Sequence, residues 1–387
     1  MEEGQNTTYH RAFYTKLRPT QAQRRYFGQC AGVARFVYNW ALADRIERYQ
    51  AGEPTNYYEQ KKRFNALKRE QYPWLADYPY VIVERAFANL DRAYQAFFRR
   101  VREGSEAPGF PKFKSRTTAR KAFCLGGNVR VEEKRVRLPR IGWVNLAERG
   151  YLPCTGQPGV KLNNVVISER AGEWYISAQY ELPRPAPIVK GGVVAIHPGV
   201  RRLATLDDGT VYENPRPLEK ELKRLAKLQR ELARRMPGSA NREKTRRKLA
   251  RLSARIANRR AHALHNVSAD IVRKRRPKRV IVQDWDIRGM LQQDAVEEGG
   301  AVNRRIHRAI ADTGMGELLR QIEYKAAWAG ADVVYVERYV SVNRPCSRCG
   351  AEKAELDASQ LIYRCEACGL EIDRDDNAAK NLRNLLA

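Results

Sequence analysis

Two cysteine pairs, Cys346-Ser-Arg-Cys349 and Cys365-Glu-Ala-Cys368, precede an acidic segment that reads Asp373-Arg-Asp-Asp-Asn-Ala-Ala-Lys-Asn-Leu382. Four thiolates at this spacing suit one tetrahedral Zn²⁺, with Zn–S bonds of about 2.3 Å. Because cysteine fills all four positions, the predicted site is closed and its zinc is expected to be structural. The cysteines could instead form disulfides, but nothing else in the sequence indicates an oxidising compartment.

The chain is strongly basic. Lys and Arg total 72 against 44 Asp and Glu, which gives a net charge of +28 at pH 7. This excess predicts a polyanionic partner, and nucleic acid fits it better than a membrane surface. No apolar run approaches the ~18 residues of a membrane span, and residues 1–4 (Met-Glu-Glu-Gly) lack the apolar core of a signal peptide. We therefore expect a cytoplasmic or nucleoid-associated protein without a membrane partner.

The first half of the chain reads as helices flanked by short strands. Apolar residues recur at steps of three and four, which predicts helices over residues 20–50, 56–71 and 79–103. Strands are predicted over residues 9–17, 122–131, 135–138, 142–146, 160–168 and 173–181. Their alternation and glycine turns predict a small antiparallel barrel. The proline-rich stretch 183–187 reads as a stiff linker and a domain boundary.

The second half has an α/β pattern. Strands are predicted over residues 193–197, 203–206, 211–212, 279–283 and 332–336. Helices are predicted over residues 217–235, 241–274 and 304–329, and from residue 377 onward. Three antiparallel strands followed by helix, strand, helix, strand and helix form the layout of an RNase H-like fold.

Several segments resemble the TnpB family of insertion-sequence proteins, relatives of the type V CRISPR effectors. They are Leu17-Arg-Pro-Thr20, Arg35-Phe-Val-Tyr-Asn39, residues 195–209, residues 281–290, residues 323–326 and the acidic segment after the cysteines. The resemblance implies a multidomain α+β protein. A helical bundle is inserted in a small β-barrel, and a RuvC-type RNase H-like domain with an inserted four-cysteine zinc ribbon follows.

The resemblance also implies domain boundaries. The barrel, or wedge-like domain, is expected at residues 1–18 and 105–184, and the helical recognition domain at residues 19–104. The RuvC-like domain is expected at residues 188–340 and 371–387, and the zinc ribbon at residues 341–370. The family occurs as transposon-derived proteins, so we expect a bacterial or archaeal cytoplasm.

RuvC-type nucleases cleave DNA with carboxylates from the first strand, the fourth strand and the last helix, which hold two Mg²⁺ about 3.5–4 Å apart. The resemblance places these positions at His197, Gln283 and Asp375. The formal charge of the set therefore falls from −3 to −1. Histidine prefers softer metals than Mg²⁺, and a neutral amide is a weak ligand. We expect no active catalytic residue here, and at most weak Mg²⁺ binding.

Neighbouring carboxylates are poor substitutes. Asp284 follows Gln283 directly, and successive residues of a strand point to opposite faces. Asp207 and Asp208 belong to a hairpin turn at the far end of the strand from His197. Two further acidic residues next to Asp375 could help to hold one ion, namely Asp373 and Asp376.

Basic and aromatic residues form candidate nucleic-acid contacts in two regions. Those singled out are Arg35, Tyr38, Asn39, Lys112, Lys114, Arg242, Arg246, Arg247, Arg251, Arg255 and Arg259. A charged helix face is usually only solvated, but the excess of basic over acidic residues favours phosphate contact here. The stretch His265-Asn-Val-Ser268 fits either helix packing or a specific contact. The resemblance implies a guide RNA and target double-stranded DNA as partners, and leaves protein partners open.

The sequence therefore predicts an RNA-guided, sequence-specific DNA-binding protein with a degenerate RuvC site, which binds its target without cleavage and represses transcription. One alternative is an active TnpB-type RNA-guided DNA endonuclease of a transposable element, with its missing ligands supplied from elsewhere. Another is a nucleic-acid-binding accessory of a mobile element that uses no guide.

Overall fold

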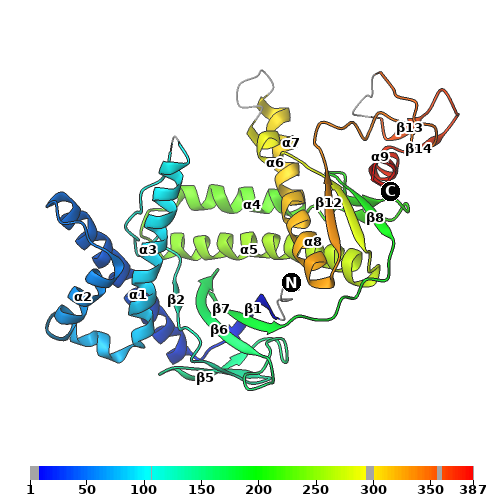
Figure 1. Cartoon of the computed structure of the whole chain (residues 1–387). Helices are drawn as coiled ribbons and strands as arrows, with labels where there is room; N and C mark the ends of the chain where they lie inside the picture. The colour runs from blue at the N-terminus through cyan, green and yellow to red at the C-terminus, as the bar shows by residue number, and fades with distance from the viewer. Residues whose placement is uncertain (1–7, 106, 293–299, 355–359, 387) are drawn as a thin grey trace. The chain divides into compact units, whose positions relative to one another are not determined.

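The computed structural model describes residues 8–105, 107–292, 300–354 and 360–386, and divides into two compact units, Met1–Arg184 and Pro185–Ala387 (Figure 1). The expectation about residues 1–4 lies outside the described residues. No helix in these ranges is long and apolar enough to cross a membrane. The finer division into four domains stays a prediction.

The first unit contains one seven-stranded antiparallel sheet. Its strands are β1 (Thr8–Arg18), β2 (Ala122–Cys124), β3 (Arg130–Val131), β4 (Arg135–Leu138), β5 (Gly142–Leu146), β6 (Lys161–Arg170) and β7 (Glu173–Pro183). They lie in the order β2-β6-β7-β1-β5-β4-β3. Strand β1 pairs with β7 along Thr8–Lys16 and with β5 at its last two residues, so it joins the two halves of the sheet.

The predicted barrel is not closed. The strands at the two ends of the sheet, β2 and β3, do not pair with each other among the described residues. They are three and two residues long, too short for an extended ladder. The segment 122–131, predicted as one strand, is divided between them by a turn at Gly126 and Gly127. A Cβ atom on Gly127 would lie 2.7 Å from the carbonyl oxygen of Leu162, so only glycine fits this close approach.

Three helices lie between β1 and β2 in the chain: α1 (Gln21–Gln50), α2 (Tyr57–Gln71) and α3 (Tyr80–Arg102), with a 3₁₀ turn at Pro73–Asp77. Helix α1 begins with a capping box between Thr20 and Gln23, which satisfies two backbone N–H groups at its start. Fully buried aromatic residues from each helix, including Phe27, Phe64 and Phe87, form the core of the bundle.

The second unit contains a five-stranded sheet of RNase H-like topology. Its strands are β8 (Val193–Pro198), β9 (Arg202–Leu206), β10 (Val211–Glu213), β11 (Arg279–Gln283) and β12 (Asp332–Val336), in the order β10-β9-β8-β11-β12. Strand β9 is antiparallel to both β8 and β10, whereas β11 runs parallel to both β8 and β12. This arrangement matches the layout predicted from the order of elements.

The helices of this unit are α4 (Pro217–Arg234), α5 (Ala240–Ala269, continued by a π-helical turn to Lys274), α6 (Ile287–Gln292), α7 (Gly300–Thr313), α8 (Met315–Ala329) and α9 (Arg374–Asn384). Three of them, α5, α8 and α9, pack on the two faces of the sheet. Ile196, Val280 and Val282 pack with residues of α5 and α8 on one face. The alternate residues Ala195 and Ile281 pack under α9 on the other.

The single helix predicted over residues 304–329 is wrong. Gly314 adopts φ +70° and separates α7 from α8. Glycine tolerates this conformation because it lacks a Cβ atom. The last helix also begins three residues earlier than predicted, because Asp373 caps it by accepting a hydrogen bond from the backbone N–H of Asp375 at 2.9 Å.

Candidate functional site

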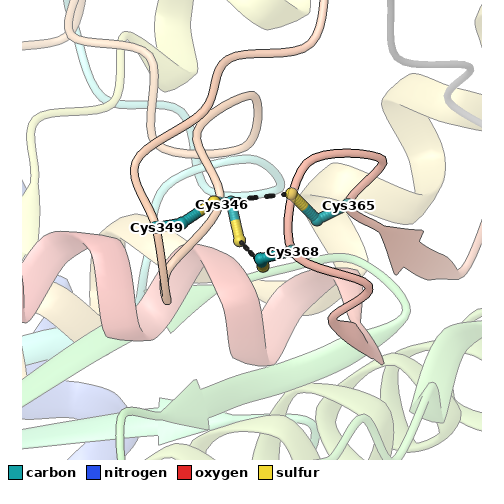
Figure 2. A group of neighbouring side chains, drawn as sticks. All are labelled: Cys346, Cys349, Cys365 and Cys368. Carbon is teal, nitrogen blue, oxygen red and sulfur yellow. Dashed lines mark hydrogen bonds between the residues drawn. The ribbon is translucent and has the colours of Figure 1, made fainter.

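The four cysteines of the ribbon converge, as predicted (Figure 2). Their sulfur atoms all lie within 4.8 Å of one another, and two Sγ–Sγ distances, Cys346–Cys368 and Cys349–Cys365, are 3.6 Å. A tetrahedron with Zn–S bonds of about 2.3 Å has edges of about 3.8 Å, whereas a disulfide bond measures about 2.05 Å. The donor set therefore fits one structural Zn²⁺ and does not fit disulfides.

Both cysteine pairs form the same turn. The N–H of Gly350 donates to the carbonyl of Cys346 at 2.9 Å, and the N–H of Gly369 donates to that of Cys365 at 3.0 Å. Gly350 has φ +77° and Gly369 has φ +69°, which their lack of a Cβ atom allows. The short hairpin of β13 (Ile362–Arg364) and β14 (Glu371–Asp373) joins the second pair to α9.

Asparagines of α9 hold the first cysteine pair. Asn377 and Asn381 both donate to the carbonyl of Pro345 at 2.8 Å, and Asn381 also donates to that of Val342 at 2.9 Å. The N–H of Ser347 donates back to the Asn377 side chain at 2.9 Å. Both asparagines are buried, so these bonds fix the ribbon against the helix that carries Asp375.

His197 and Asp375 line one cavity of about 740 Å³ in the second unit, together with Trp285 and Arg201. His197 is the next-to-last residue of the central strand β8, and Asp375 lies in the first turn of α9; both are about 6% exposed. Burial lowers the pKa of His197 to about 4, although the nearby carboxylate of Asp375 opposes the shift. His197 is therefore neutral at physiological pH. Gln283, also a described residue, is not among those that line the cavity.

Arginines neutralise the carboxylates at this site. Nη2 of Arg201 lies 2.9 Å from a carboxylate oxygen of Asp373 and 2.9 Å from one of Asp375. Arg202 contacts Asp373 at 2.8 Å, and Arg374 contacts Asp375 at 3.7 Å. Burial would raise the pKa of Asp373, but hydrogen bonds from Arg201 and from a backbone N–H outweigh it, and the pKa is lowered.

Gln283 uses its amide as a donor. Its Nε2 donates to the carbonyl of Val340 at 2.8 Å and lies 3.5 Å from that of Arg338, both in the segment after β12. A carboxylate has no N–H to give, so glutamate at this position would bring two acceptors together. The neighbouring Asp284 instead pairs with the Arg338 side chain at 2.5 Å. This ion pair does not involve the His197 cavity.

The other carboxylates considered as substitutes also have partners within the chain. Asp207 accepts a hydrogen bond from the backbone N–H of Ala195 at 2.8 Å and pairs with Arg383 of α9. Asp208 pairs with Arg275, and Asp376 pairs with Lys380 at 3.2 Å. None of these three is among the residues that line the cavity.

The candidate contacts of the first unit meet one another. The side chain of Asn39 donates to the carbonyl of Lys114 at 3.0 Å and accepts from its N–H at 2.8 Å. The Lys114 ammonium lies 3.5 Å from the centre of the buried Tyr38 ring. These three residues therefore attach the 107–121 segment to α1. Lys112 is exposed and Arg35 half-buried, which leaves both accessible to a ligand.

The candidate nucleic-acid contacts of the second unit fall into two groups, arginines that have partners within the chain and arginines that are exposed without them. Arg242 donates to the carbonyls of Leu232 and Arg235, at 2.7 and 2.8 Å, and so caps the end of α4. Three others contact acidic side chains of the same helical pair: Arg246 and Arg247 pair with Glu243, and Arg259 pairs with Glu221. Arg251 and Arg255 are exposed, and neither makes an ion pair or hydrogen bond within the described part of the chain.

The stretch His265–Ser268 acts in packing. Ser268 is fully buried and contacts Gln321 at 3.0 Å and the ammonium of Lys325 at 2.6 Å, which joins α5 to α8.

The contacts of Arg201 and those of Asp312 were not predicted from the sequence. Asp312 accepts from the first backbone N–H groups of α4 and pairs with Arg260 of α5 at 2.7 Å. The doubled arginine at 201–202, directly after the first strand, was the only signal for the first of these.

Three family profiles match parts of the chain. Residues 177–294 match OrfB_IS605, described as "Probable transposase", and residues 316–382 match the Cas12f1-like TNB domain. Residues 9–54 match a profile described as a helix-turn-helix domain. In this structure residues 9–54 form strand β1 and one continuous helix, α1, rather than two helices joined by a turn.

Similar proteins align along nearly the whole chain. "Putative RNA-guided DNA endonuclease InsQ" of Escherichia coli (strain K12) is 33% identical, covering 96% of this chain and 91% of that protein. A relative from Streptomyces pristinaespiralis, named "Putative RNA-guided DNA endonuclease", is 31% identical, with 96% and 88% covered. The fold resembles that of Cas12f1 in a Cas12f1–sgRNA–target DNA complex, with a TM-score of 0.54, 13% identity, and 94% and 83% covered. On the extent and identity of the InsQ alignment, the chain belongs to the TnpB family of IS605-type transposases.

Proposed function

We propose that this protein is guided by an RNA to a specific DNA sequence, binds it without cleaving it, and represses transcription there. Relatives named as RNA-guided DNA endonucleases support the first part, as does the likeness to a fold seen with a guide RNA and target DNA. In such proteins base pairing reads the sequence, and the protein itself reads a short flanking motif. Guide RNA and double-stranded DNA are the proposed partners.

The observation that carries the second part is the contact of Arg201 with Asp373 and Asp375. Two-metal cleavage requires oxygen ligands with spare negative charge. Here three guanidinium groups contact the two carboxylates, so their charge is already neutralised. A Mg²⁺ ion would have to displace Arg201 and would then meet a neutral imidazole at position 197. We therefore assign the degenerate RuvC positions His197, Gln283 and Asp375 no catalytic role.

Gln283 supports the same proposal. Its side chain is committed to backbone carbonyls after β12, where an amide can act and a carboxylate cannot. The surroundings of this position therefore suit glutamine better than glutamate. The four-cysteine ribbon would hold Zn²⁺ and keep α9 in place, so that the unit retains its shape for binding.

The test compares binding and cleavage in one preparation. The full chain is purified with the RNA that accompanies it, that RNA is sequenced, and matched double-stranded DNA is offered in Mg²⁺ and in Mn²⁺. We expect a stable complex with matched DNA, intact strands, and reduced reporter transcription when the target overlaps a promoter. Scrambled DNA of equal length is the control. Cleavage of matched DNA by the unaltered protein would overturn the proposal.

An active endonuclease is the second candidate, because the named relatives carry that activity in their names. The double variant His197→Asp, Gln283→Glu separates the two. If the protein is already active, the variant should leave its cleavage rate unchanged. An accessory without a guide would instead copurify with heterogeneous RNA and bind matched and scrambled DNA equally.

A further inference from the structure

Helices α4 and α5 pack against each other and project away from the sheet as a basic arm (Figure 1). The exposed residues Arg251 and Arg255 lie on this arm. Helix α5 is anchored at its far end, because Leu264 and Val267 belong to the core that packs on the sheet. Helix α4 has no comparable apolar anchor, since Pro217 is the one residue buried among those that the structure describes in it. Its start is therefore held mainly by polar contacts.

The start of α4 is capped by a residue of another helix. The first backbone N–H groups of a helix have no partners within it, and Arg216, directly before α4, provides no side-chain cap. Pro217 has no N–H to satisfy. The N–H groups of Leu218 and Glu219 donate to the carboxylate of Asp312 at 3.0 and 3.3 Å. Asp312 lies in α7, so α7 supplies the cap that α4 lacks.

The same residue holds α5. Nη2 of Arg260 donates to the carboxylate of Asp312 at 2.7 Å, and Nε of Arg260 donates to its carbonyl at 2.8 Å. The next residue, Thr313, accepts a hydrogen bond from Asn214 at 3.1 Å, directly after β10. A Cβ atom on Gly314 would lie 3.2 Å from the Arg260 side chain, so glycine leaves room for the arginine. Three consecutive residues between α7 and α8 thus contact the base of the arm.

Contacts at the base determine where the rest of the arm lies. Helix α4 has 18 residues, which at 1.5 Å per residue gives a length of about 27 Å. A rotation of roughly 10° at its start would displace its other end by about 5 Å. A hydrogen bond to a phosphate oxygen is lost over a much smaller displacement. Phosphate contacts made by the arm therefore depend on how firmly its base is held.

We propose that Asp312 is a positioning residue for nucleic-acid binding, which fixes the direction of the arm so that Arg251 and Arg255 contact phosphate groups together. Asp312 is acidic and 5% exposed, so it does not contact phosphate itself. The inference rests on the proposed function, because it requires nucleic acid to lie on the arm. It predicts an effect opposite in sign to that of charge. Removing an acidic group from a chain of net charge +28 should strengthen attraction to a polyanion, whereas loosening the arm should weaken it.

The test variant is Asp312→Asn. Asparagine offers one acceptor oxygen where aspartate offers two, so it cannot hold Arg260 and the start of α4 at once, and its NH₂ group faces a donor. The matched control is Glu317→Gln, which removes equal charge from a carboxylate of α8 that pairs with Arg320 at 2.7 Å. A second variant, Arg260→Lys, keeps the net charge but loses the fork that spans the carbonyl and the carboxylate.

The probe is a fluorescein-labelled RNA–DNA duplex of about 20 base pairs. Its binding to the full chain, freed of copurified RNA, is followed by anisotropy between about 0.1 and about 0.4 M NaCl. Amide hydrogen exchange on the same preparations shows whether each variant is folded. In Asp312→Asn the N–H groups of residues 218–219 should exchange faster, while those of β8 and β11 keep their protection.

We expect Asp312→Asn to weaken binding by roughly tenfold and to reduce the salt slope by about 1 to 2, although no basic residue is removed. Arg260→Lys should weaken binding in the same direction, and Glu317→Gln should leave it unchanged or strengthen it. In a chain that already carries Arg251→Gln and Arg255→Gln, Asp312→Asn should add little, because the contacts that it positions are gone.

Three results would overturn the inference. They are a folded Asp312→Asn chain that binds as tightly as the unaltered one or more tightly, an equal loss in Glu317→Gln, and an undiminished effect of Asp312→Asn in the absence of both arginines. Each leaves guided binding without cleavage in place. Cleavage of matched DNA would overturn the proposed function but not the positioning role. Failure of the unaltered chain to bind the duplex would overturn both.

Discussion

Replacing Gln283 by glutamate, which restores the expected carboxylate, should destabilise the protein at neutral pH. The native amide is 7% exposed and donates to the carbonyl of Val340 at 2.8 Å. A protonated glutamic acid can still donate one O–H bond there, but an ionised one cannot, and its charge is removed from water. Both effects raise the pKa of the new carboxyl in the folded state.

The magnitude follows from linkage. A folded-state pKa about two units above the ordinary value near 4.3 costs about 3 kcal/mol at pH 8 and about 1 kcal/mol at pH 5. Because folding raises the pKa of the new carboxyl, the variant keeps its stability at low pH and loses it as the pH rises through the folded-state pKa. For a domain of roughly 200 residues, about 3 kcal/mol lowers Tm by roughly 6–12 °C.

Thermal melts of Gln283→Glu and of the unaltered chain, at pH 8 and pH 5 without added Mg²⁺, provide the measurement. Gln283→Met is the matched control, because it keeps the size but has neither donor nor titratable group. We expect it to lower Tm by the same amount at both pH values. The reasoning is refuted if Gln283→Glu melts like the unaltered chain at pH 8, or if its deficit does not shrink at pH 5.

Three further predictions concern the metal, a buried histidine and the basic helices. Substituting Cys349 by serine should reduce bound zinc from one per chain, by elemental analysis, and lower Tm by several degrees, because the ribbon fixes α9; unchanged zinc content would contradict the assignment. Because the pKa of His197 is lowered to about 4, its contribution to stability is complete above about pH 6.5 and is lost as the pH falls toward 4; His197→Gln should flatten the urea-measured stability over that range. Arg242→Ala should lower the free energy of unfolding by about 1 kcal/mol and leave the salt dependence of RNA binding unchanged. The double variant Arg251→Gln, Arg255→Gln should leave stability unchanged and reduce the slope of log binding constant against log salt concentration by about 1 per arginine. Equal salt slopes for the two variants would refute the distinction between a structural Arg242 and phosphate-contacting Arg251 and Arg255.

Periodicity predicted most elements because each depends on neighbours along the chain. The strand at residues 279–283 and the helix start after Thr20 are set by local apolar patterns and a local cap. The open sheet of the first unit was missed for the opposite reason. Alternation shows that a strand has one buried face, but it does not show whether the first and last strands of the sheet meet.

The contacts of the candidate site residues were not predicted from the sequence. Resemblance located His197, Gln283 and Asp375, but Arg201 pairs with Asp375 across 174 positions of sequence. Asn39 was expected to face nucleic acid, yet it binds the backbone of Lys114, 75 positions away. Such pairings depend on how the chain returns on itself, and neither residue's immediate sequence carries that information.

The position of the α4–α5 pair in the chain has a consequence for how the second unit tolerates change. Strand β10 ends at Glu213 and β11 begins at Arg279, and these two helices lie in the connection between them. The free energy needed to close a flexible connection rises only with the logarithm of its length, by about 0.6 kcal/mol for each doubling. Lengthening or shortening this basic pair by whole helical turns should therefore leave the central sheet nearly as stable. Variants of this chain that differ in the length of the α4–α5 pair can therefore keep the same central sheet.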